Sequence, residues 1–348
     1  MIESSRIARF LTNHHLGLIL MPTEQCNFRC TYCYEDFAIG KMSKSTIQGV
    51  KNLILKRGPE LKSLAIDWFG GEPLAGKDVI YEIGSYVQEL IKNQFPQIIY
   101  KGAMTTNGFL LKGQTLRKML DLNIRSYQIS LDGPKEIHDK TRVRIDQSGS
   151  FDAIWANLLA MREVPDEFKV TLRVHVTPEN YQALDGLVSD IQKEFGHDAR
   201  FGVFFKAISN LGGENGGTFQ TLKGKERSEI LENLYAKLQP DKNISPFRAN
   251  QEPYVCYTSK PNHLVIRANG SIAKCTVVFN DDRNSLGKIH EDGTLDIDQE
   301  KLQLWVRGIQ TQDEKTMHCP LHGLPQLNKE NSQKDAQAKL SEIRVAVA

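Results

Sequence analysis

Three cysteines within eight residues are the feature of this sequence with the clearest chemical meaning. They are Cys26, Cys30 and Cys33, and no fourth cysteine lies near them. In a chain of this size, clustered cysteines favour a metal site or catalysis over a disulfide. Three thiolates in one loop can hold three irons of a [4Fe–4S] cluster and leave the fourth iron open for another ligand. Three thiolates with a distant histidine could also hold a structural zinc ion.

A second group of cysteines lies in the last quarter of the chain. It comprises Cys256, Cys275 and Cys319, separated from the first group by over two hundred residues. That separation predicts a second, distinct metal site. His322 follows Cys319 closely, and imidazole nitrogen can complete an iron–sulfur site. The alternatives are that one iron stays open for substrate, or that His322 only caps a turn before Gly323.

The elements that must position these residues follow a regular pattern. Short apolar runs alternate with longer amphipathic segments, which predicts repeated β/α units around a parallel sheet. The predicted strands are Leu16–Met21, Leu64–Trp68, Ile99–Met104, Ser126–Leu131, Val170–Val176 and Arg200–Phe205. The predicted helices are Ser43–Lys56, Val79–Phe95, Thr115–Leu122, Phe151–Met161, Tyr181–Phe195 and Lys225–Leu238. Near-continuous apolar strands indicate burial on both faces. Because six units fall short of an eight-fold barrel, we predict an α/β fold with a partial (β/α)6 barrel.

Polar and glycine-rich motifs follow most of the predicted strands. The cysteine loop follows the first, Phe69–Pro73 (FGGEP) the second, Thr105–Gly108 (TTNG) the third, and Ser130–Gly133 (SLDG) ends the fourth. In β/α barrels the loops at the carboxyl ends of the strands build the active site, so these motifs should converge on one mouth. Paired glycines let the backbone approach a ligand closely. Taken alone, GGEP and TNG are also ordinary turn sequences.

The pattern changes after the sixth unit. The β/α rhythm ends near Pro240–Pro246, and beyond it Asn269-Gly270 separates two apolar runs, His263–Arg267 and Ser271–Val278, which predicts a hairpin. We therefore expect a barrel domain over residues 1–240, a second domain over 241–327 and a polar tail over 328–348. The tail is either a terminal helix or disordered.

Composition narrows the function classes. Hydrophobic residues at 40% and charged residues at 25% are ordinary for a soluble globular protein. A formal charge of +2, with no basic block, gives no reason to expect a nucleic-acid partner. No apolar run is long enough to cross a bilayer, and the N-terminus lacks signal-peptide features. We therefore predict a cytoplasmic protein without a membrane or nucleic-acid partner.

The first cysteine group, with Tyr32 directly before its last cysteine, resembles the radical S-adenosylmethionine (radical SAM) superfamily. In that family the amino and carboxylate groups of S-adenosylmethionine chelate the open iron of a [4Fe–4S] cluster. An electron from the cluster then cleaves a carbon–sulfur bond to give methionine and a 5′-deoxyadenosyl radical. The resemblance covers roughly Leu16 to Leu238 and makes a zinc site much less favoured. It implies the cluster and S-adenosylmethionine as cofactors.

The resemblance also implies roles for individual residues. The GGEP motif corresponds to the segment that binds the methionine amino group, through Glu72 or a backbone carbonyl. Ser130 and Asp132 correspond to the residues that bind the ribose hydroxyls. Arg142 resembles the arginine that pairs with the methionine carboxylate, with Arg144 as the competing candidate. The cofactor-binding residues implied in this way are Tyr32, Gly70, Gly71, Glu72, Pro73, Asn107, Ser130, Asp132 and Arg142. Tyr32 either packs beside the adenine or simply against the barrel.

The second cysteine group resembles the beginning of the auxiliary-cluster domain called SPASM and of its shorter relative, the twitch domain. The matching pattern is Cys256, thirteen residues, Gly270, four residues and Cys275. The full SPASM pattern has seven cysteines and two clusters. Since only three cysteines are present here, the resemblance implies one auxiliary cluster, as in twitch domains. His322 stands where the second cysteine of a Cys-x-x-Cys pair would be expected.

These motifs together resemble enzymes that modify peptides or protein side chains. We therefore predict a radical SAM oxidoreductase acting as a peptide maturase, which installs an oxidative crosslink in a ribosomally synthesised peptide. The alternatives are a twitch-type dehydrogenase of a small molecule and formylglycine-type sulfatase maturation. A non-catalytic zinc-binding module is a third class. The predicted partners of a radical SAM enzyme are its substrate and a reductant such as flavodoxin or ferredoxin.

Overall fold

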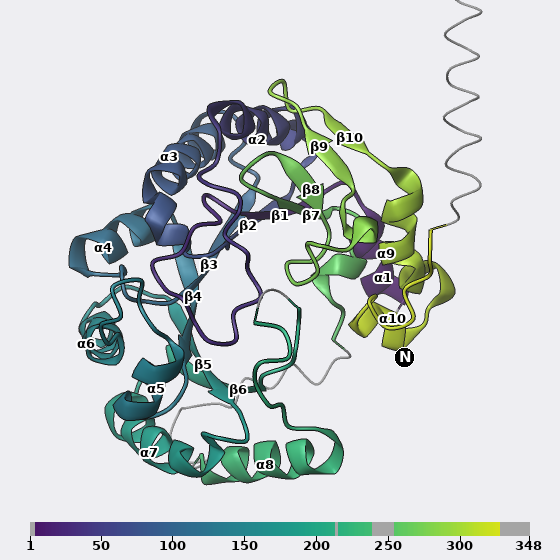
Figure 1. Ribbon diagram of the computed structural model, residues 1–348. Helices are drawn as coiled ribbons and strands as arrows, with labels where there is room; N and C mark the ends of the chain where they lie inside the picture. The colour runs from purple at the N-terminus through teal and green to yellow at the C-terminus, as the bar shows by residue number, and fades with distance from the viewer. Residues whose placement is uncertain (1–3, 213–214, 239–253, 328–348) are drawn as a thin grey trace, which may run out of the picture.

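The chain folds around one curved β-sheet with helices on its outer side. In the computed structural model, residues 4–212, 215–238 and 254–327 are described. Ten strands form the sheet, in the order β10-β9-β8-β7-β1-β2-β3-β4-β5-β6. Figure 1 shows the strands in an open arc with α2, α3, α4, α6, α7 and α8 around the outside. The predicted partial barrel is confirmed.

Six parallel strands, β1 to β6, form the barrel. They are β1 (His15–Leu20), β2 (Ser63–Trp68), β3 (Ile99–Thr106), β4 (Ile124–Leu131), β5 (Lys169–Val176) and β6 (Phe201–Ala207). Each pairs in parallel with the next along the chain. Every strand end lies within two residues of its predicted position. The apolar runs therefore located the strands well.

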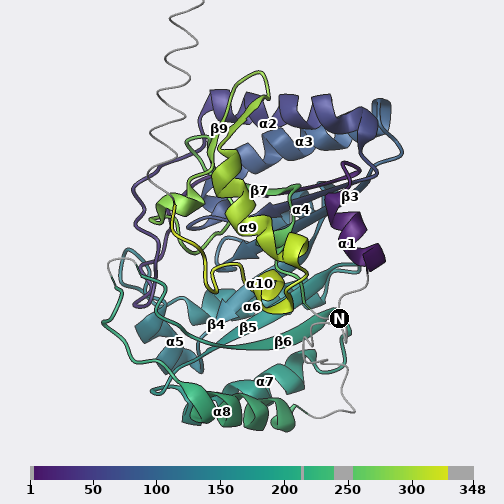
Figure 2. The ribbon, with the colours of Figure 1, turned by 90° about the vertical axis from the view of Figure 1, so that its right-hand side faces the viewer.

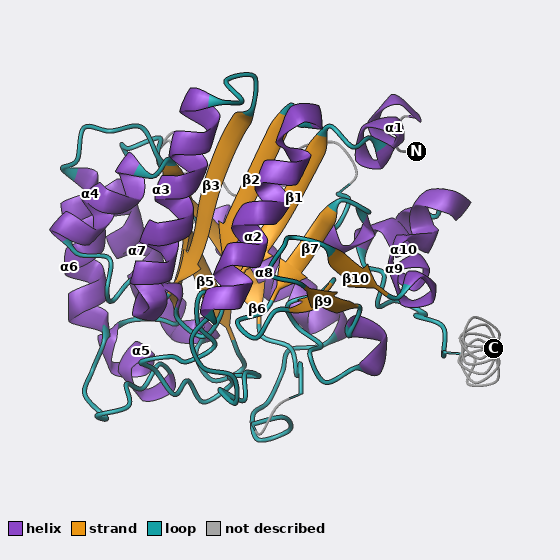
Figure 3. Cartoon of the chain, turned by 90° about the horizontal axis from the view of Figure 1, so that it is seen from above, coloured by secondary structure: helices purple, strands orange, loops and turns teal. Residues whose placement is uncertain are grey.

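The outer helices also lie close to their predicted positions. They are α2 (Lys44–Arg57), α3 (Lys77–Asn93), α4 (Gly113–Asp121), α6 (Phe151–Arg162), α7 (Leu184–Phe195) and α8 (Gly224–Lys237). Ser43 caps the first of these, because its side chain accepts a hydrogen bond from the Thr46 backbone N–H. Figure 3 shows α2 and α3 lying across β1, β2 and β3. Two short helices were not predicted, α1 (Ser4–Leu11) and α5 (Lys135–Thr141).

In several barrel strands the two faces differ in burial, contrary to the expectation of burial on both faces, which β1 does meet. In β2, Leu64, Ile66 and Trp68 are buried, whereas the alternate residues are half-buried. The same alternation occurs in β6, and over most of β5. Side chains alternate between the faces of a strand, so the apolar row meets the helices. The other row faces the lumen, where Arg173 and Lys206 are among its polar members. The arc leaves this face without a covering layer, which is why it tolerates polar residues.

The C-terminal segment extends the barrel sheet. Strand β7 (His263–Ile266) pairs in parallel with β1, so that Gly17 lies opposite His263. The predicted hairpin is present, since β7 pairs antiparallel with β8 (Ser271–Ala273). Two further strands follow, β9 (Gly287–Ile289) and β10 (Leu295–Ile297). The predicted boundary at 240/241 and the predicted tail over 328–348 lie outside the described residues.

Two C-terminal helices pack beside the N-terminal helix. These are α9 (Gln299–Thr311) and α10 (Glu314–His318), and Figure 2 shows them near α1. Ile7, Val255, Ile309 and Met317 form the small apolar cluster that joins them. This packing brings the segment around Cys256 onto α10. Within the described part of the chain, no helix combines the length and the apolar character needed to cross a membrane.

Candidate active site

A cavity of about 360 Å³ lies at the carboxyl ends of the barrel strands. The structure brings most of the predicted site residues to its wall. Those that line it are Cys26, Cys30, Tyr32, Cys33, Gly70, Gly71, Asn107, Ser130 and Arg142. Glu72, Pro73 and Asp132 are buried but do not line it. The predicted convergence of the strand-end motifs on one mouth is therefore present for nine residues of this set.

The first cysteine loop is fastened to the chain segment after α5. The Arg29 and Thr31 backbone N–H groups donate to the carbonyls of Val143 at 2.6 Å and Thr141 at 2.9 Å. Burial raises the pKa of all three thiols, in the case of Cys33 to about 12. The thiols are therefore protonated at neutral pH, and metal ligation must displace their protons. Three thiols lining one cavity are a donor set that fits an iron–sulfur cluster with one open iron.

No three His, Cys, Asp or Glu side chains in the described ranges are grouped so that they could hold a single metal ion.

The two glycines of the GGEP motif allow the cysteine loop to pack closely. Gly70 has φ of +123°, and a Cβ at this position would lie 2.2 Å from the Thr23 carbonyl oxygen. A Cβ at Gly71 would lie 2.6 Å from the carbonyl oxygen of Gln25. Any larger residue would therefore push against the backbone that leads into Cys26. The glycines were predicted to let the backbone approach a ligand closely. The structure shows that they let the first cysteine loop pack closely against the motif.

Glu72 joins the second and third strand-end loops from behind the cavity wall. Its carboxylate accepts hydrogen bonds from the backbone N–H of Leu74 at 3.0 Å, the Thr106 hydroxyl at 2.7 Å and the backbone N–H of Asn107 at 2.7 Å. Burial raises the pKa of Glu72, and these three donors act against the rise. Glu72 does not line the cavity, so in this structure its carboxylate joins the two loops, while Gly70 and Gly71 of the same motif lie on the cavity wall.

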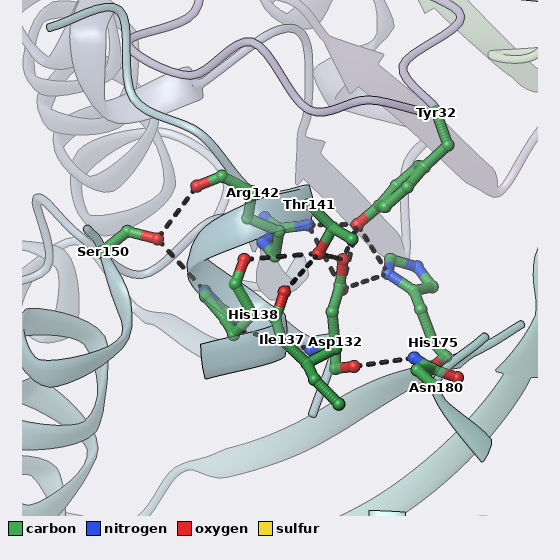
Figure 4. A network of polar contacts seen from close by, with 9 residues as sticks. All are labelled: Tyr32, Asp132, Ile137, His138, Thr141, Arg142, Ser150, His175 and Asn180. Atoms are coloured by element: carbon green, nitrogen blue, oxygen red, sulfur yellow. Dashed lines mark hydrogen bonds and ion pairs between the residues drawn. The ribbon is translucent and has the colours of Figure 1, made fainter. Parts of the chain in front are cut away.

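Asp132 is the centre of a buried polar network beside the cavity (Figure 4). Its carboxylate accepts hydrogen bonds from Tyr32 Oη at 2.7 Å and Thr141 Oγ1 at 2.7 Å, and it lies 3.0 Å from His175 Nδ1. Burial alone would raise the pKa of Asp132. The hydrogen bond to His175, and the charges of His175 and Arg142, outweigh it and hold that pKa well below its usual value. Ser130 lies on the cavity wall, whereas Asp132 holds Tyr32 and His175 in place behind it.

Of the two candidate arginines, Arg142 and Arg144, it is Arg142 that lines the cavity. Its Nη1 donates to Tyr32 Oη at 2.9 Å and lies 3.9 Å from Asp132 Oδ1. Its Nε is buried and has no hydrogen-bond partner among the described residues. Arg144 does not line the cavity; it pairs with Asp146 at 2.8 Å and lies over the Phe109 ring. The placement of the two side chains favours Arg142 over Arg144 as an anion-binding group.

Several wall residues were not predicted from the sequence. Arg173 and His175 on β5, Lys206 on β6, and Glu35 after the cysteine loop all line the cavity. Burial raises the pKa of Glu35 to about 8, with the Glu24 charge acting in the same direction. A signal for β5 was present, because Thr171, Arg173 and His175 are the polar members of an alternating apolar run.

The second cysteine group is also assembled by the fold. The Cys256 backbone N–H donates to the Met317 carbonyl at 2.9 Å, which places it beside α10 and Cys319. Burial raises the pKa of Cys275 to about 11, and the charges of Cys256 and Cys319 add to the rise. The Tyr257 hydroxyl, next to Cys256, accepts a hydrogen bond from the Thr276 backbone N–H at 3.0 Å, which brings the chain beside Cys256 to the chain beside Cys275. His322 lies on an exposed turn, where its backbone N–H donates to the Cys319 carbonyl at 2.9 Å.

Comparison with known proteins gives the family of the barrel. Residues 20–191 match the Radical SAM superfamily. The chain is 27% identical over 228 residues to the cysteine-type anaerobic sulfatase-maturating enzyme of Clostridium novyi (strain NT), which covers 63% of this chain and 59% of that enzyme. The chain spans less than two thirds of the length of this enzyme and of other curated relatives that it matches.

Solved structures show the same architecture. Native anSMEcpe with bound AdoMet and Cp18Cys peptide has a TM-score of 0.63 and 19% identity, and the match covers 83% of this chain and 80% of that one. SuiB of Streptococcus suis bound to S-adenosylmethionine has a TM-score of 0.55 and 15% identity, with 92% and 69% covered. At these identities the likeness establishes the fold.

Proposed function

Residues 20–191 of this chain form a radical SAM domain, and from this premise we propose that the chain is a radical SAM oxidoreductase that abstracts hydrogen from a peptide. The observation that carries the proposal is one cavity lined by three thiols and by the incompletely paired Arg142. The radical SAM family binds a [4Fe–4S] cluster and S-adenosylmethionine, and the donor set of this cavity fits both.

Different residues of the chain would bind the cluster and the separate groups of S-adenosylmethionine. Cys26, Cys30 and Cys33 would hold three irons, and Arg142 would pair with the methionine carboxylate. Gly70, Gly71 and Ser130 line the same cavity, and we propose that backbone carbonyls of the two glycines would bind the ammonium group and the Ser130 hydroxyl the ribose. When bound, the cofactors would supply the electron transfer and the 5′-deoxyadenosyl radical that removes a hydrogen atom.

The protein around the cavity holds these groups in position. The carboxylate of Asp132 orients the Tyr32 hydroxyl, which in turn accepts from Arg142. Asn180 donates to the Asp132 carbonyl at 2.7 Å and to the His175 carbonyl at 2.9 Å, which ties the end of β4 to β5. The network therefore fixes both the predicted carboxylate-binding arginine and the adjoining cavity wall.

We propose an oxidative crosslink in a ribosomally synthesised peptide as the product. SuiB, a fold neighbour, is also solved bound to the precursor peptide SuiA. The second candidate is formylglycine-type sulfatase maturation, which the similarity to the Clostridium novyi enzyme favours. The reductant would be a flavodoxin or ferredoxin, and the chain would act in the cytoplasm.

We further propose that Cys256, Cys275 and Cys319 bind one auxiliary iron–sulfur cluster. The support is the pair of hydrogen bonds that bring the neighbouring segments together, from the Cys256 backbone N–H to the Met317 carbonyl and from the Thr276 backbone N–H to the Tyr257 hydroxyl. His322 stays our candidate for the fourth ligand; an iron left open for substrate is the alternative. The backbone N–H of His322 donates to the Cys319 carbonyl, so the two residues are held in one exposed turn.

The test uses the full chain, purified and reconstituted without oxygen. A brown protein with broad absorbance supports iron–sulfur clusters, whereas a colourless zinc protein would exclude them. With dithionite and S-adenosylmethionine, 5′-deoxyadenosine should form faster on adding a peptide, either the Cp18Cys peptide or a short precursor encoded beside this gene. An aldehyde in the product indicates formylglycine, and a crosslink without an aldehyde indicates the leading proposal. Stimulation by a small metabolite and not by peptides would contradict both.

A further inference from the structure

Two basic side chains on the cavity wall lack partners. Arg173 lies on β5 and Lys206 on β6, and both line the cavity that the three thiols line. Register pairs Arg173 with Phe204 and His175 with Lys206, so the two basic residues are diagonal neighbours on the lumen face. In the part of the chain that the structure describes, neither makes a hydrogen bond or an ion pair, and Arg173 Nε is buried.

The fold does not account for this pair of charges. A buried charge is costly unless it is paired, and burial lowers the pKa of both side chains. The Arg173 charge lowers the pKa of Lys206 further, so the two cations also destabilise each other. Asp132, the carboxylate of the buried network beside the cavity, already accepts hydrogen bonds from Tyr32 and Thr141. A bound anion would remove both costs.

We propose that Arg173 and Lys206 bind a carboxylate of the substrate, and so hold the substrate in the cavity that the first cysteine loop lines. This inference rests on the proposed function, because it concerns the substrate side of the same site. A guanidinium beside an ammonium suits a carboxylate, since the planar guanidinium can bind both oxygens.

The pair comes from other elements than the residue proposed for S-adenosylmethionine. Arg142 follows α5, whereas Arg173 lies on β5 and Lys206 on β6. Arg173 interacts electrostatically with Tyr32 and Tyr34 of the first cysteine loop and with Arg142, whereas Lys206 interacts with Cys319 of the second group. The pair therefore lines the cavity beside the first cysteine loop and within electrostatic reach of the second cysteine group.

The experiment measures binding and not turnover. Radiolabelled glutarate serves as the carboxylate probe and glutaramide as its uncharged counterpart, in equilibrium dialysis against the anaerobically reconstituted full chain. Glutarate should bind more tightly than glutaramide. Arg173→Met and Lys206→Met should each weaken glutarate binding about tenfold, and Arg173→Lys should recover part of the loss. Iron content and S-adenosylmethionine affinity should stay at the parent values. Arg227→Met is the matched control, because Arg227 is exposed on α8, lies near Lys206 and is not on the cavity wall.

Three results would overturn the inference. Glutarate that binds no more tightly than glutaramide, or equally well to the Arg173→Met/Lys206→Met double variant, removes the carboxylate site. Displacement of glutarate by S-adenosylmethionine would assign the pair to the cofactor's carboxylate. Loss of iron with unchanged glutarate binding would assign the charges to the metal-bound thiolates. Failure of peptides to stimulate turnover would contradict the proposed function and leave the dialysis result standing, so the two failures are distinguishable.

Discussion

Arg142→Met tests the residue that we propose for the methionine carboxylate. The Arg142 side chain is buried, donates to Tyr32 Oη at 2.9 Å and leaves its Nε without a partner among the described residues. Methionine keeps most of the length of the side chain, although the guanidinium's contact with the Phe28 ring is lost with the charge. Tyr32 keeps its hydrogen bond to Asp132 at 2.7 Å. The substitution therefore removes the charge without leaving the tyrosine hydroxyl unpaired.

The expected loss follows from the kind of contact removed. A hydrogen bond between a guanidinium and a carboxylate contributes about 1.5–3 kcal/mol. The dissociation constant of S-adenosylmethionine should therefore rise about 10- to 150-fold. The assay is equilibrium dialysis of S-adenosylmethionine against the reconstituted chain without reductant, so that no cofactor is consumed. Iron per chain and the thermal midpoint are measured in parallel, and both should match the parent protein.

Arg144→Met is the control for this experiment. Arg144 pairs with Asp146 at 2.8 Å, lies 4.4 Å from the Phe109 ring centre and is absent from the cavity wall. Its removal should leave S-adenosylmethionine affinity within about twofold of the parent value, because surface ion pairs contribute little. Unchanged affinity in Arg142→Met, or a loss confined to Arg144→Met, would refute the assignment.

Further predictions concern the metal sites and the sheet. Replacing the three thiol residues of the loop 26–33 with alanine should remove about four irons per chain and abolish 5′-deoxyadenosine formation; deoxyadenosine made by that variant would disprove the central proposal. In that triple-alanine variant, His322→Ala should change the electron paramagnetic resonance signal of the auxiliary cluster. If the triple-alanine variant contains no iron at all, the proposal of an auxiliary cluster is disproved. Gly17→Ala should lower the free energy of unfolding by about 1–3 kcal/mol, measured by urea titration, because a Cβ there would lie 2.4 Å from His263 Nδ1; unaltered stability would show that the ring moves freely. Burial lowers the pKa of His263 to about 3, so the free energy of unfolding should fall as pH drops from about 6.5 towards 3, by up to about 1.4 kcal/mol per pH unit. His263→Gln should flatten that slope, and an identical slope would rule this histidine out as its source.

Local sequence signals located the elements and the first site. Strand ends were predicted within two residues because alternate apolar rows must face the outer helices. The cysteine loop was recognisable because its chemistry depends on spacing along the chain alone. The lumen residues of β5 also carried a local signal, the alternation of Thr171, Arg173 and His175 within an apolar run. That signal was overlooked because the run was interpreted as a strand buried on both faces.

Other features of the site depend on contacts between distant segments. Glu72 is bound by Thr106 and Asn107, thirty-four and thirty-five residues away. No local pattern distinguishes this role from ligand binding. The choice between Arg142 and Arg144 likewise depends on which side of the segment after α5 faces Tyr32. Strand β7 pairs in parallel with β1, so that Gly17 lies opposite His263, about 246 residues later in the sequence. No local turn sequence predicts such a distant pairing.

That pairing explains why the two cysteine groups belong to one structure. Strand β1 leads into the first cysteine loop, and β7 leads into the hairpin that precedes Cys275. Where the two strands end, Arg267 donates to the buried Glu24 carboxylate at 2.5 Å, and the Ala268 backbone N–H donates to it at 3.2 Å. A buried carboxylate that lost these donors would be left uncompensated, which is strongly destabilising. Two sets of hydrogen bonds therefore connect the first cysteine loop with the hairpin. One set is the backbone pairing of β1 with β7, and the other is the set that Glu24 accepts. The sheet thus sets the separation between the two cysteine groups, although they lie more than two hundred residues apart in the sequence.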